Sequence, residues 1–248
     1  MAVSDSSRKL PARGREPSLP SPAALIIFAK APLPGQVKTR LCPPLAPDEA
    51  ATLHGTMVLD TLERSRNLLG FDRFLACSPS QQHPFFQAVG ARQGVRLLDQ
   101  AHGDLGCRIH RAMSSVFDSG YRHVVVVGTD LPAVHADVFR QALKGLGTHD
   151  VVLGPSVDGG YYLIGLNRPA PDLFADIPWS TDQVLTDTQE KAQSLHQSVQ
   201  LLTQQRDLDT LADLRFFIKE IQGPGKTRIS ARTAQVLKTL ARRLTTRE

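Results

Sequence analysis

The run His123-Val124-Val125-Val126-Val127-Gly128 constrains the fold of this chain more than any other feature. It is continuous and β-branched, which is typical of a strand that is buried on both faces in the middle of a parallel sheet. A second apolar run, Ala24-Leu25-Ile26-Ile27-Phe28, has the same character. Strand-like runs of this kind alternate with helix-like segments along the chain, and this alternation predicts βαβ units around a mostly parallel sheet.

The predicted elements follow from apolar spacing and from the glycines that end helical patterns. We expect strands at 25–29, 71–76, 94–98, 123–128, 150–153, 161–166 and, at an edge, 199–202. We expect helices at 48–69, 84–90, 104–119, 137–146, 182–197 and 229–245, with a further helix opening at Asp209-Thr210. A chain of 248 residues suits one α/β core, and its ligands would bind at the carboxyl ends of the strands.

Charge and composition divide the chain into three parts. Residues 1–22 are rich in Ser, Pro and Arg, lack an apolar stretch, and are expected to form a disordered leader rather than a secretory signal. The domain is expected at 23–222, and 223–248 is expected to be a basic helix or tail that packs on the domain or on a second subunit. The net charge of +5 belongs to the two ends, since residues 23–218 are mildly acidic. We therefore expect no nucleic-acid partner.

The expected compartment is the cytoplasm. Three scattered cysteines, Cys42, Cys77 and Cys107, form no Cys-x-x-Cys pair, which favours a reducing environment over a disulfide framework or a zinc site. The most apolar runs have the length of strands, so we expect no membrane span.

A loop rich in Pro, Gly and cations follows the first predicted strand. Pro32, Pro34 and Gly35 favour a turn whose backbone N–H groups face a ligand, and Lys30, Lys38 and Arg40 offer positive charge to phosphate oxygens. The loop matches neither a Walker A motif nor a Gly-x-Gly-x-x-Gly fingerprint. It is predicted to bind the phosphates of a nucleotide, and a plain surface turn with solvated cations is the alternative.

Two carboxylates are candidates for a divalent cation, Mg²⁺ or Mn²⁺. Asp130 follows the central strand within Gly128-Thr129-Asp130-Leu131-Pro132, and Asp209 lies in Arg206-Asp207-Leu208-Asp209-Thr210. Carboxylates that bridge a hard cation to substrate phosphates suit phosphoryl and sugar transfer. For each of the two, capping of the following helix is the competing interpretation.

The segment Gly154-Pro155-Ser156-Val157-Asp158-Gly159-Gly160-Tyr161-Tyr162 joins two predicted strands. Asp158 is our candidate for orienting or deprotonating the acceptor, and Gly159 and Gly160 would let a substrate lie against the backbone. A simple hairpin turn is the alternative. Trp179 is expected in a loop, with Ser180 or Thr181 capping the next helix.

Four blocks, in order between residues 24 and 215, resemble those of the bacterial glycosyltransferase-like family named as radical-SAM/selenodomain-associated transferases. They read Phe-Ala-Lys-x-Pro-x-Pro-Gly-x-Val-Lys-Thr-Arg-Leu, Gly-Thr-Asp-Leu-Pro, Gly-Pro-x-x-Asp-Gly-Gly-Tyr-Tyr-Leu-Ile-Gly and Ile-Pro-Trp-Ser-Thr. Asp104-Leu105-Gly106 with Arg108 matches a further block, although Cys107 and Ile109 are less usual there.

The resemblance implies an α/β, three-layer, Rossmann-like nucleotide-diphospho-sugar transferase fold with a mostly parallel central sheet. It implies that Lys38 and Arg40 grip phosphates while Asp130 and Asp209 hold the metal. The family is also similar to nucleotidyltransferases, including the guanylyltransferase of deazaflavin cofactor synthesis, which shares a Lys-x-Arg-Leu loop and a late Asp-x-Asp-Thr.

Three functions follow as hypotheses. The first is a metal-dependent glycosyltransferase-like enzyme that takes a nucleotide-diphosphate-sugar donor and a small-molecule acceptor. The second is a nucleotidyltransferase that moves NMP from NTP to a phosphorylated or acidic small molecule and releases pyrophosphate. The third is a non-catalytic nucleotide-binding or assembly protein, which the pair Asp130 and Asp209 disfavours. Oligomerisation is left open.

Overall fold

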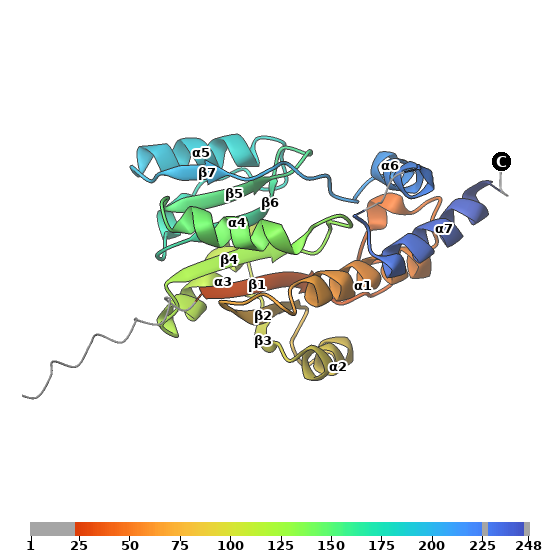
Figure 1. Ribbon diagram of the computed structural model, residues 1–248, viewed down its shortest axis with the longest axis horizontal. Coiled ribbons are helices and arrows are strands. Elements are labelled where there is room, and N and C mark those ends of the chain that lie inside the picture. The colour runs from red at the N-terminus through yellow and green to blue at the C-terminus, as the bar shows by residue number, and fades with distance from the viewer. Residues whose placement is uncertain (1–22, 225–227, 246–248) are drawn as a thin grey trace, which may run out of the picture.

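A computed structural model describes residues 23–224 and 228–245; the predicted leader, 1–22, lies outside the described residues. Seven strands form one sheet in the order β3-β2-β1-β4-β6-β5-β7 (Figure 1). The strands are β1 (Ala23–Lys30), β2 (Phe71–Ser78), β3 (Arg96–Asp99), β4 (His123–Gly128), β5 (Val151–Pro155), β6 (Tyr161–Leu166) and β7 (Val199–Leu201). The helices are α1 (Pro47–Arg64), α2 (Pro84–Gln93), α3 (Leu105–Asp118), α4 (Ala136–Leu146), α5 (Val184–Ser194), α6 (Leu211–Gln222) and α7 (Ala231–Thr245), with 3-10 turns η1 (Thr39–Leu41) and η2 (Pro171–Phe174).

The sheet is mostly parallel, which confirms the predicted fold class. β1 pairs in parallel with β2 and with β4, and β5 pairs in parallel with β7. The exception is β6, which is antiparallel to both of its neighbours, β4 and β5. The Asp158 segment therefore turns as a hairpin, the alternative that the sequence left open, and the start of β6 lies at the same sheet edge as the end of β4.

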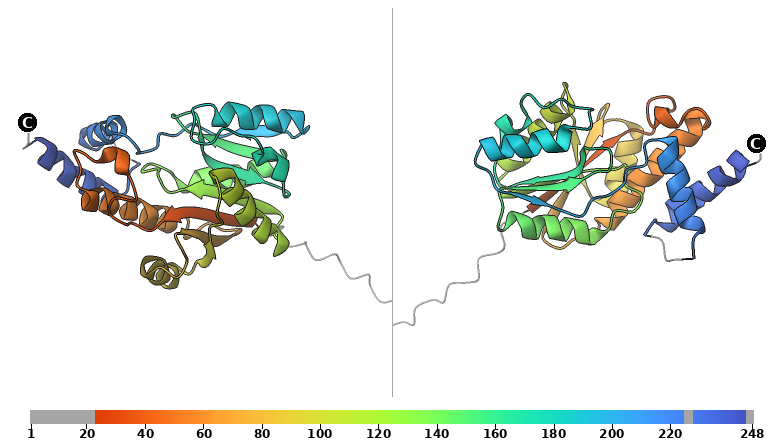
Figure 2. Two further views of the ribbon diagram at one scale, coloured as in Figure 1. Left: turned by 180° about the vertical axis from the view of Figure 1, so that it is seen from behind. Right: turned by 90° about the horizontal axis from the view of Figure 1, so that it is seen from above.

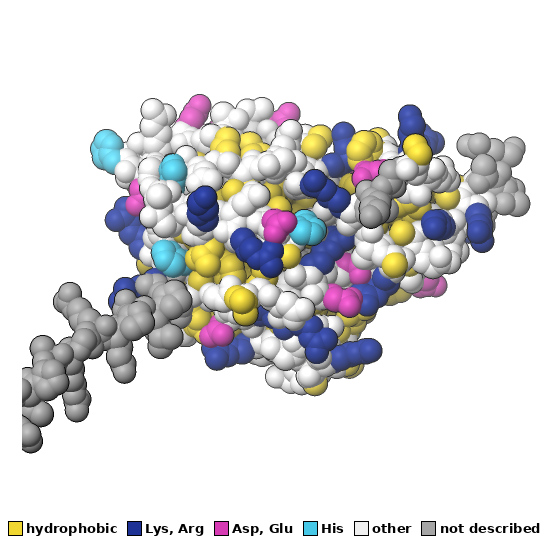
Figure 3. All heavy atoms as spheres, viewed as in Figure 1, with side chains coloured by type: hydrophobic (Ala, Val, Ile, Leu, Met, Phe, Trp, Pro, Cys, Tyr) yellow, Lys and Arg dark blue, Asp and Glu magenta, His cyan; other side chains and the backbone are white. Residues whose placement is uncertain are grey.

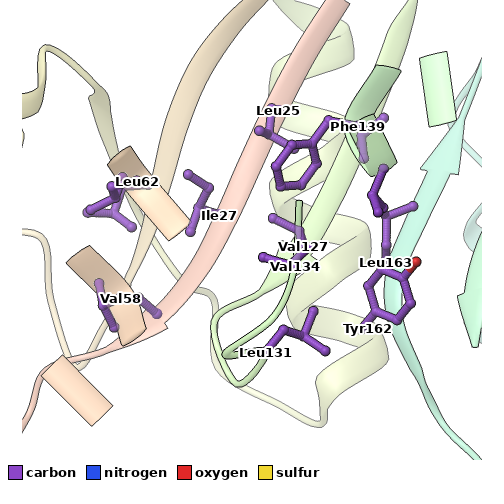
Figure 4. Close-up of a cluster of buried hydrophobic side chains, with 14 of the residues drawn as sticks. Leu25, Ile27, Val58, Leu62, Val127, Leu131, Val134, Phe139, Tyr162 and Leu163 are labelled. Atoms are coloured by element: carbon purple, nitrogen blue, oxygen red, sulfur yellow. The ribbon is translucent and has the colours of Figure 1, made fainter. Parts of the chain in front are cut away.

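Alternation along the strands divides the core into two layers around the sheet. In β1, Leu25 and Ile27 face α1, α2 and α4, while Ala24 and Ile26 face α3, α5 and η2. Figure 4 shows the first of these layers, where Phe139 of α4 packs beside Leu25 of β1, and Leu131 and Val134 follow β4 into the same cluster. Burying both faces of a parallel sheet requires these continuous apolar strands.

A third apolar cluster lies beyond the sheet. It joins η1, α1, α6 and α7 and includes Leu41, Leu53, Phe217, Leu237 and Leu240. In all views α7 runs beside α1 and α6, at one end of the molecule and beyond the sheet (Figures 1 and 2). The predicted helix at 229–245 is thus present, and it packs on the domain itself.

Five predicted helix boundaries were wrong by two residues or more: those at 69, 90, 182, 197 and 229 lie at Arg64, Gln93, Val184, Ser194 and Ala231. The helix predicted over 48–69 ends at Arg64, because the chain turns at Ser65 so that Leu68 returns to the core while Leu69 is 92% exposed. Gly70, with φ +85°, precedes β2 and does not end a helix. The helix predicted from 182 begins at Val184 with Gln183 at its N-cap, so neither Ser180 nor Thr181 is the cap residue.

The surface carries charge of both signs. On the face shown in Figure 3, Lys and Arg side chains are scattered over several elements and do not gather into one stripe. Within the described ranges, no helix has the length and apolar character that crossing a bilayer requires.

Candidate active site

The loop after β1 presents Lys38 to the carboxyl edge of the sheet. Lys38 adopts the left-handed conformation, with φ 50°, and caps η1. Leu41, at the end of η1, is fully buried in the α1–α6–α7 cluster, so the loop is anchored directly after its cations. Gly35 also has positive φ, and open space surrounds it. The loop therefore holds one lysine inward while Arg40 stays exposed at the rim of a cavity.

Lys38, Asp130 and Asp209 form a compact charge triad. The Lys38 Nζ lies 2.5 Å from Asp130 Oδ1 and 2.6 Å from Asp209 Oδ1. Only 3% of the lysine side chain is exposed, compared with 43% for Asp130 and 38% for Asp209. Burial lowers the pKa of Lys38, but the two carboxylates outweigh it, and the net pKa is raised. Burial raises the pKa of Asp130, but Lys38 and His54 outweigh it and hold that pKa below its usual range.

Neither aspartate is a helix cap. His135 occupies the N-cap of α4, and Thr210 occupies the N-cap of α6, where it exchanges hydrogen bonds with Asp213 in a capping box. Asp209 therefore lies one residue before the cap, free to reach Lys38. The Leu208 N–H donates to the Asp130 carbonyl at 2.9 Å, which ties the two segments together.

His54 lies beneath this triad and was missed by the sequence analysis. It sits on α1 with 4% of the residue exposed. Its Nε2 lies 3.0 Å from the Lys30 carbonyl, to which it donates, and its Nδ1 lies 3.7 Å from Asp130 Oδ1. A single histidine on the buried face of an amphipathic helix carries no periodic signal. Its contact with the end of β1 appears only once the helix packs on the sheet.

A cavity of about 570 Å³ opens at this edge of the sheet. It is lined by the residues that were predicted to bind phosphate and metal and that the structure brings together here: Lys30, Lys38, Arg40, Asp130 and Asp209. Its wall also contains residues from α3, β4 and β6, including Arg108, Gly128 and Tyr161.

Gln100 and Arg108 fix another part of the cavity wall. The Gln100 Nε2 donates to the carbonyls of Ala29 and Ala76, at 3.1 and 2.7 Å, at the ends of β1 and β2. Its Oε1 accepts a hydrogen bond from the Arg108 guanidinium. The amide therefore locks the arginine in position before any ligand arrives. Gln100 was not predicted, because the carbonyls of Ala29 and Ala76 that orient it belong to strands far from it along the chain.

Asp207 also lines the cavity, and its pKa is raised to about 7. Burial is the main cause, and the nearby carboxylates of Asp158, Asp130 and Asp209 raise it further, while a hydrogen bond from the Ser156 hydroxyl opposes the shift. A carboxyl group in this state can accept or donate a proton near neutral pH.

Asp158, Gly159 and Gly160 form the turn between β5 and β6 and are not among the cavity-lining residues. Asp158 Oδ1 accepts from the Gly160 N–H at 3.0 Å. Gly159 has φ +89°, and a Cβ there would lie 2.1 Å from the Asp182 carbonyl oxygen, so this glycine is required by close packing. The predicted catalytic role of Asp158 and the predicted ligand contacts of the two glycines stay predictions.

The donor set at the triad fits a divalent cation that shares its ligands with a substrate. Asp130 and Asp209 place two carboxylate oxygens within 2.6 Å of one cationic nitrogen. Hard cations such as Mg²⁺ commonly take one or two carboxylates from the protein and complete their shell with phosphate oxygens and water. No cluster of three or more His, Cys, Asp or Glu side chains suited to a metal occurs in 23–224 or 228–245, which disfavours an all-protein cage.

Comparisons with known proteins place this fold in a class. A protein from Desulfovibrio desulfuricans G20, described as a nucleotide-diphospho-sugar transferase, is 32% identical, with a TM-score of 0.81 over 90% of this chain and 96% of its own. This chain belongs to the same family, within the nucleotide-diphospho-sugar transferases, a class of nucleotide-dependent transferases. The family model described as "Uncharacterized protein conserved in bacteria (DUF2064)" matches residues 61–181.

More distant structures share the fold. The 4-diphosphocytidyl-2C-methyl-D-erythritol synthase of Anaerococcus prevotii DSM 20548 is 10% identical, with a TM-score of 0.55 over 82% of this chain and 99% of its own. A CMP:2-keto-3-deoxy-manno-octonic acid synthetase in complex with CTP is 15% identical, with a TM-score of 0.52 over 79% of this chain and 97% of its own. No curated protein sequence matches this chain.

Proposed function

We propose that this chain is a metal-dependent glycosyltransferase-like enzyme that uses a nucleotide-diphosphate-sugar donor and a small-molecule acceptor. The observation that carries the proposal is the convergence of Lys38, Asp130 and Asp209 in a cavity of about 570 Å³ at the carboxyl edge of the sheet. The 32%-identical relative is described as a nucleotide-diphospho-sugar transferase, which supports a sugar nucleotide as the donor. The narrower assignment to the radical-SAM/selenodomain-associated transferases belongs to the same proposal.

The proposed roles follow from charge and position. Lys38 and Arg40 would bind the diphosphate, and their positive charges would stabilise the negative charge that develops on it as the bond to the transferred group breaks. Asp130 and Asp209 would hold Mg²⁺ or Mn²⁺, which would supply Lewis-acid stabilisation of the same oxygens. Lys30, Gly35, Gly159 and Gly160 complete the proposed nucleotide-binding set.

The acceptor would lie near the β5–β6 turn. Asp158 is the proposed residue for orienting or deprotonating it, and its negative charge already acts on Asp207 at the cavity wall. In the proposed reaction, the acceptor oxygen attacks the sugar on the side opposite the departing diphosphate. The proton of the acceptor passes to a carboxylate on the side of the cavity near the β5–β6 turn.

Product analysis tests the proposal. The protein is incubated with Mn²⁺, with a panel of small-molecule acceptors that carry hydroxyl, phosphate or carboxylate groups, and with UDP-glucose, GDP-mannose, CTP, GTP or ATP, and the released nucleoside diphosphate and pyrophosphate are measured. A sugar donor should yield nucleoside diphosphate. Pyrophosphate from a nucleoside triphosphate would replace the proposal with nucleotidyl transfer, and absence of turnover with any donor would contradict both.

Two substitutions connect the measured activity to the triad. Asp130→Asn and Asp209→Asn should each lower kcat/KM by at least 100-fold while the thermal unfolding profile keeps its shape. Asp137→Asn, an exposed carboxylate on α4 that pairs with Arg140, is the matched control and should keep full activity.

A further inference from the structure

Lys38 occupies the position that the two carboxylates would offer to a metal ion. Its Nζ lies within 2.6 Å of both Asp130 and Asp209, and its side chain is 3% exposed. Among the described residues, its ion pairs are with these two carboxylates alone. The protein thus carries its own cation at the centre of the proposed metal site.

An ammonium and a divalent cation compete for these oxygens. Each of the two carboxylates directs Oδ1 at Lys38, so a metal ion that takes both oxygens must displace the ammonium. Displacement alone is costly, because a buried charge without a partner loses both its hydration and its counter-ions. The metal by itself should therefore bind weakly.

A phosphate group changes this balance. Lys38 lines the cavity, and its flexible four-carbon stem allows the ammonium to turn from the carboxylates to a phosphate oxygen. The carboxylates are then free for the metal, and every charge keeps a partner of opposite sign. Arg40, exposed at the cavity rim, makes no ion pair with Asp130 or Asp209 and does not compete in this way.

We propose that Lys38 is an exchangeable internal cation that blocks the metal site of the free protein and moves to the phosphates of an incoming nucleotide, so that metal and nucleotide bind cooperatively. The inference rests on the proposed function, since it uses the same metal site. It adds that metal and nucleotide each bind weakly alone, and that Lys38 is the residue that couples them.

Metal binding to the full-length protein tests the inference without turnover. Mn²⁺ alone is titrated by calorimetry and by electron paramagnetic resonance into the wild type and into Lys38→Met. The variant should bind Mn²⁺ at least tenfold more tightly, because its carboxylates are vacant. Lys144→Met is the matched control: it makes the same substitution at an exposed lysine on α4, outside the cavity, and should change the affinity less than twofold. In the presence of inorganic pyrophosphate, the difference between wild type and Lys38→Met should shrink.

The outcomes separate the inference from the function on which it rests. Equal Mn²⁺ affinity of wild type and Lys38→Met would overturn the exchange and leave the metal site in place. Absence of Mn²⁺ binding to both proteins, with and without pyrophosphate, would overturn the exchange together with the proposed metal.

A measurement on the wild type covers the case in which Lys38→Met does not fold. Lysine acylation, mapped by mass spectrometry, should be slow at Lys38 in the free protein. It should become several-fold faster when Mn²⁺ alone is saturating, and slow again when pyrophosphate is added. An acylation rate at Lys38 that Mn²⁺ does not change would show that metal and ammonium coexist, which contradicts the exchange.

Discussion

At the scale of single residues, Lys38 and Asp207 differ in the partners that compensate their charge. Lys38 has two carboxylate partners, whereas Asp207 has no cationic partner among the described residues and relies on the Ser156 hydroxyl. Both environments favour the protonated form, which is charged for the lysine and neutral for the carboxyl. The lysine is held charged, and the pKa of Asp207 is raised to about 7, so that this carboxyl keeps its proton well above the usual range. The cavity thus contains a lysine that stays charged and a carboxyl that titrates near neutral pH.

The raised pKa of Asp207 predicts a pH dependence of stability. Between its unfolded value near 3.8 and about 7, the folded state holds the proton that the unfolded state loses, so stability falls as pH rises through this window. In the metal-free protein, Asp207→Asn should remove a slope of up to about 1.4 kcal/mol per pH unit. The measurement is the free energy of unfolding in urea at pH 5, 6, 7 and 8.

Comparison with Asp137→Asn isolates the effect of burial, because this side chain is 58% exposed. The gain in stability of Asp207→Asn over the wild type should grow from pH 5 to pH 7, whereas Asp137→Asn should show no such trend. A gain that is the same at all four pH values would contradict the raised pKa.

At the scale of elements, several of the site residues lie just after the ends of strands. Lys38 follows β1, Asp130 follows β4, and Ser156 follows β5, so each enters from the carboxyl end of a parallel strand. These positions were predictable, because a continuous apolar run defines where a strand ends. The direction of β6 was not, since run length does not encode orientation and Asp158-Gly159-Gly160 suits more than one kind of turn. His54 and Gln100 also could not be predicted, because their partners meet only when helix and sheet pack.

Two glycines on different turns give a matched pair for testing the β5–β6 hairpin. Gly159 has φ +89° and is packed against the Asp182 backbone, while Gly35 has φ +74° in open space. Gly35→Ala should cost about 1 kcal/mol from backbone strain alone. Gly159→Ala should cost more than 3 kcal/mol, since the turn must also move away from Asp182.

Urea unfolding measures both costs under the same conditions. Equal destabilisation by the two substitutions would mean that the hairpin yields easily to the added methyl group. A larger loss at Gly35 would show that the phosphate loop is the more constrained turn.

At the scale of the whole molecule, α7 packs in the same apolar cluster as Leu41, which anchors the loop after β1 that is proposed to bind phosphate. Leu237 of α7 and Leu41 of η1 are both fully buried in one cluster, and Arg243 pairs with Glu49 at 2.5 Å and donates to the Pro44 carbonyl. Residues 223–248 lie beyond every sequence block and were expected to pack on the domain or on a second subunit. Within 231–245, the packing of α7 indicates that this helix supports the loop from behind.

The proposed support predicts different effects for two buried leucines. Leu237→Ala in α7 and Leu173→Ala in η2 each remove a side chain with no exposed surface, and each should lower stability by about 2–5 kcal/mol. Only Leu237→Ala should also weaken nucleotide binding to the folded protein, by about tenfold, because Leu41 loses its backing. Isothermal titration at 10 °C, with the folded fraction checked by circular dichroism, measures this. Unchanged affinity in Leu237→Ala would confine α7 to a stabilising role.

The ion pair between Lys38 and Asp209 joins residues 171 positions apart, and this has a consequence for biosynthesis. As the chain leaves the ribosome, the lysine is made early and its second carboxylate only after β7 is complete. Closing so long a loop costs more entropy than forming local contacts, and the pair cannot exist in a nascent chain that stops before Asp209. If the proposed metal site is correct, its two carboxylates come together only after Asp209 has been made, so shorter nascent chains would not compete for the metal.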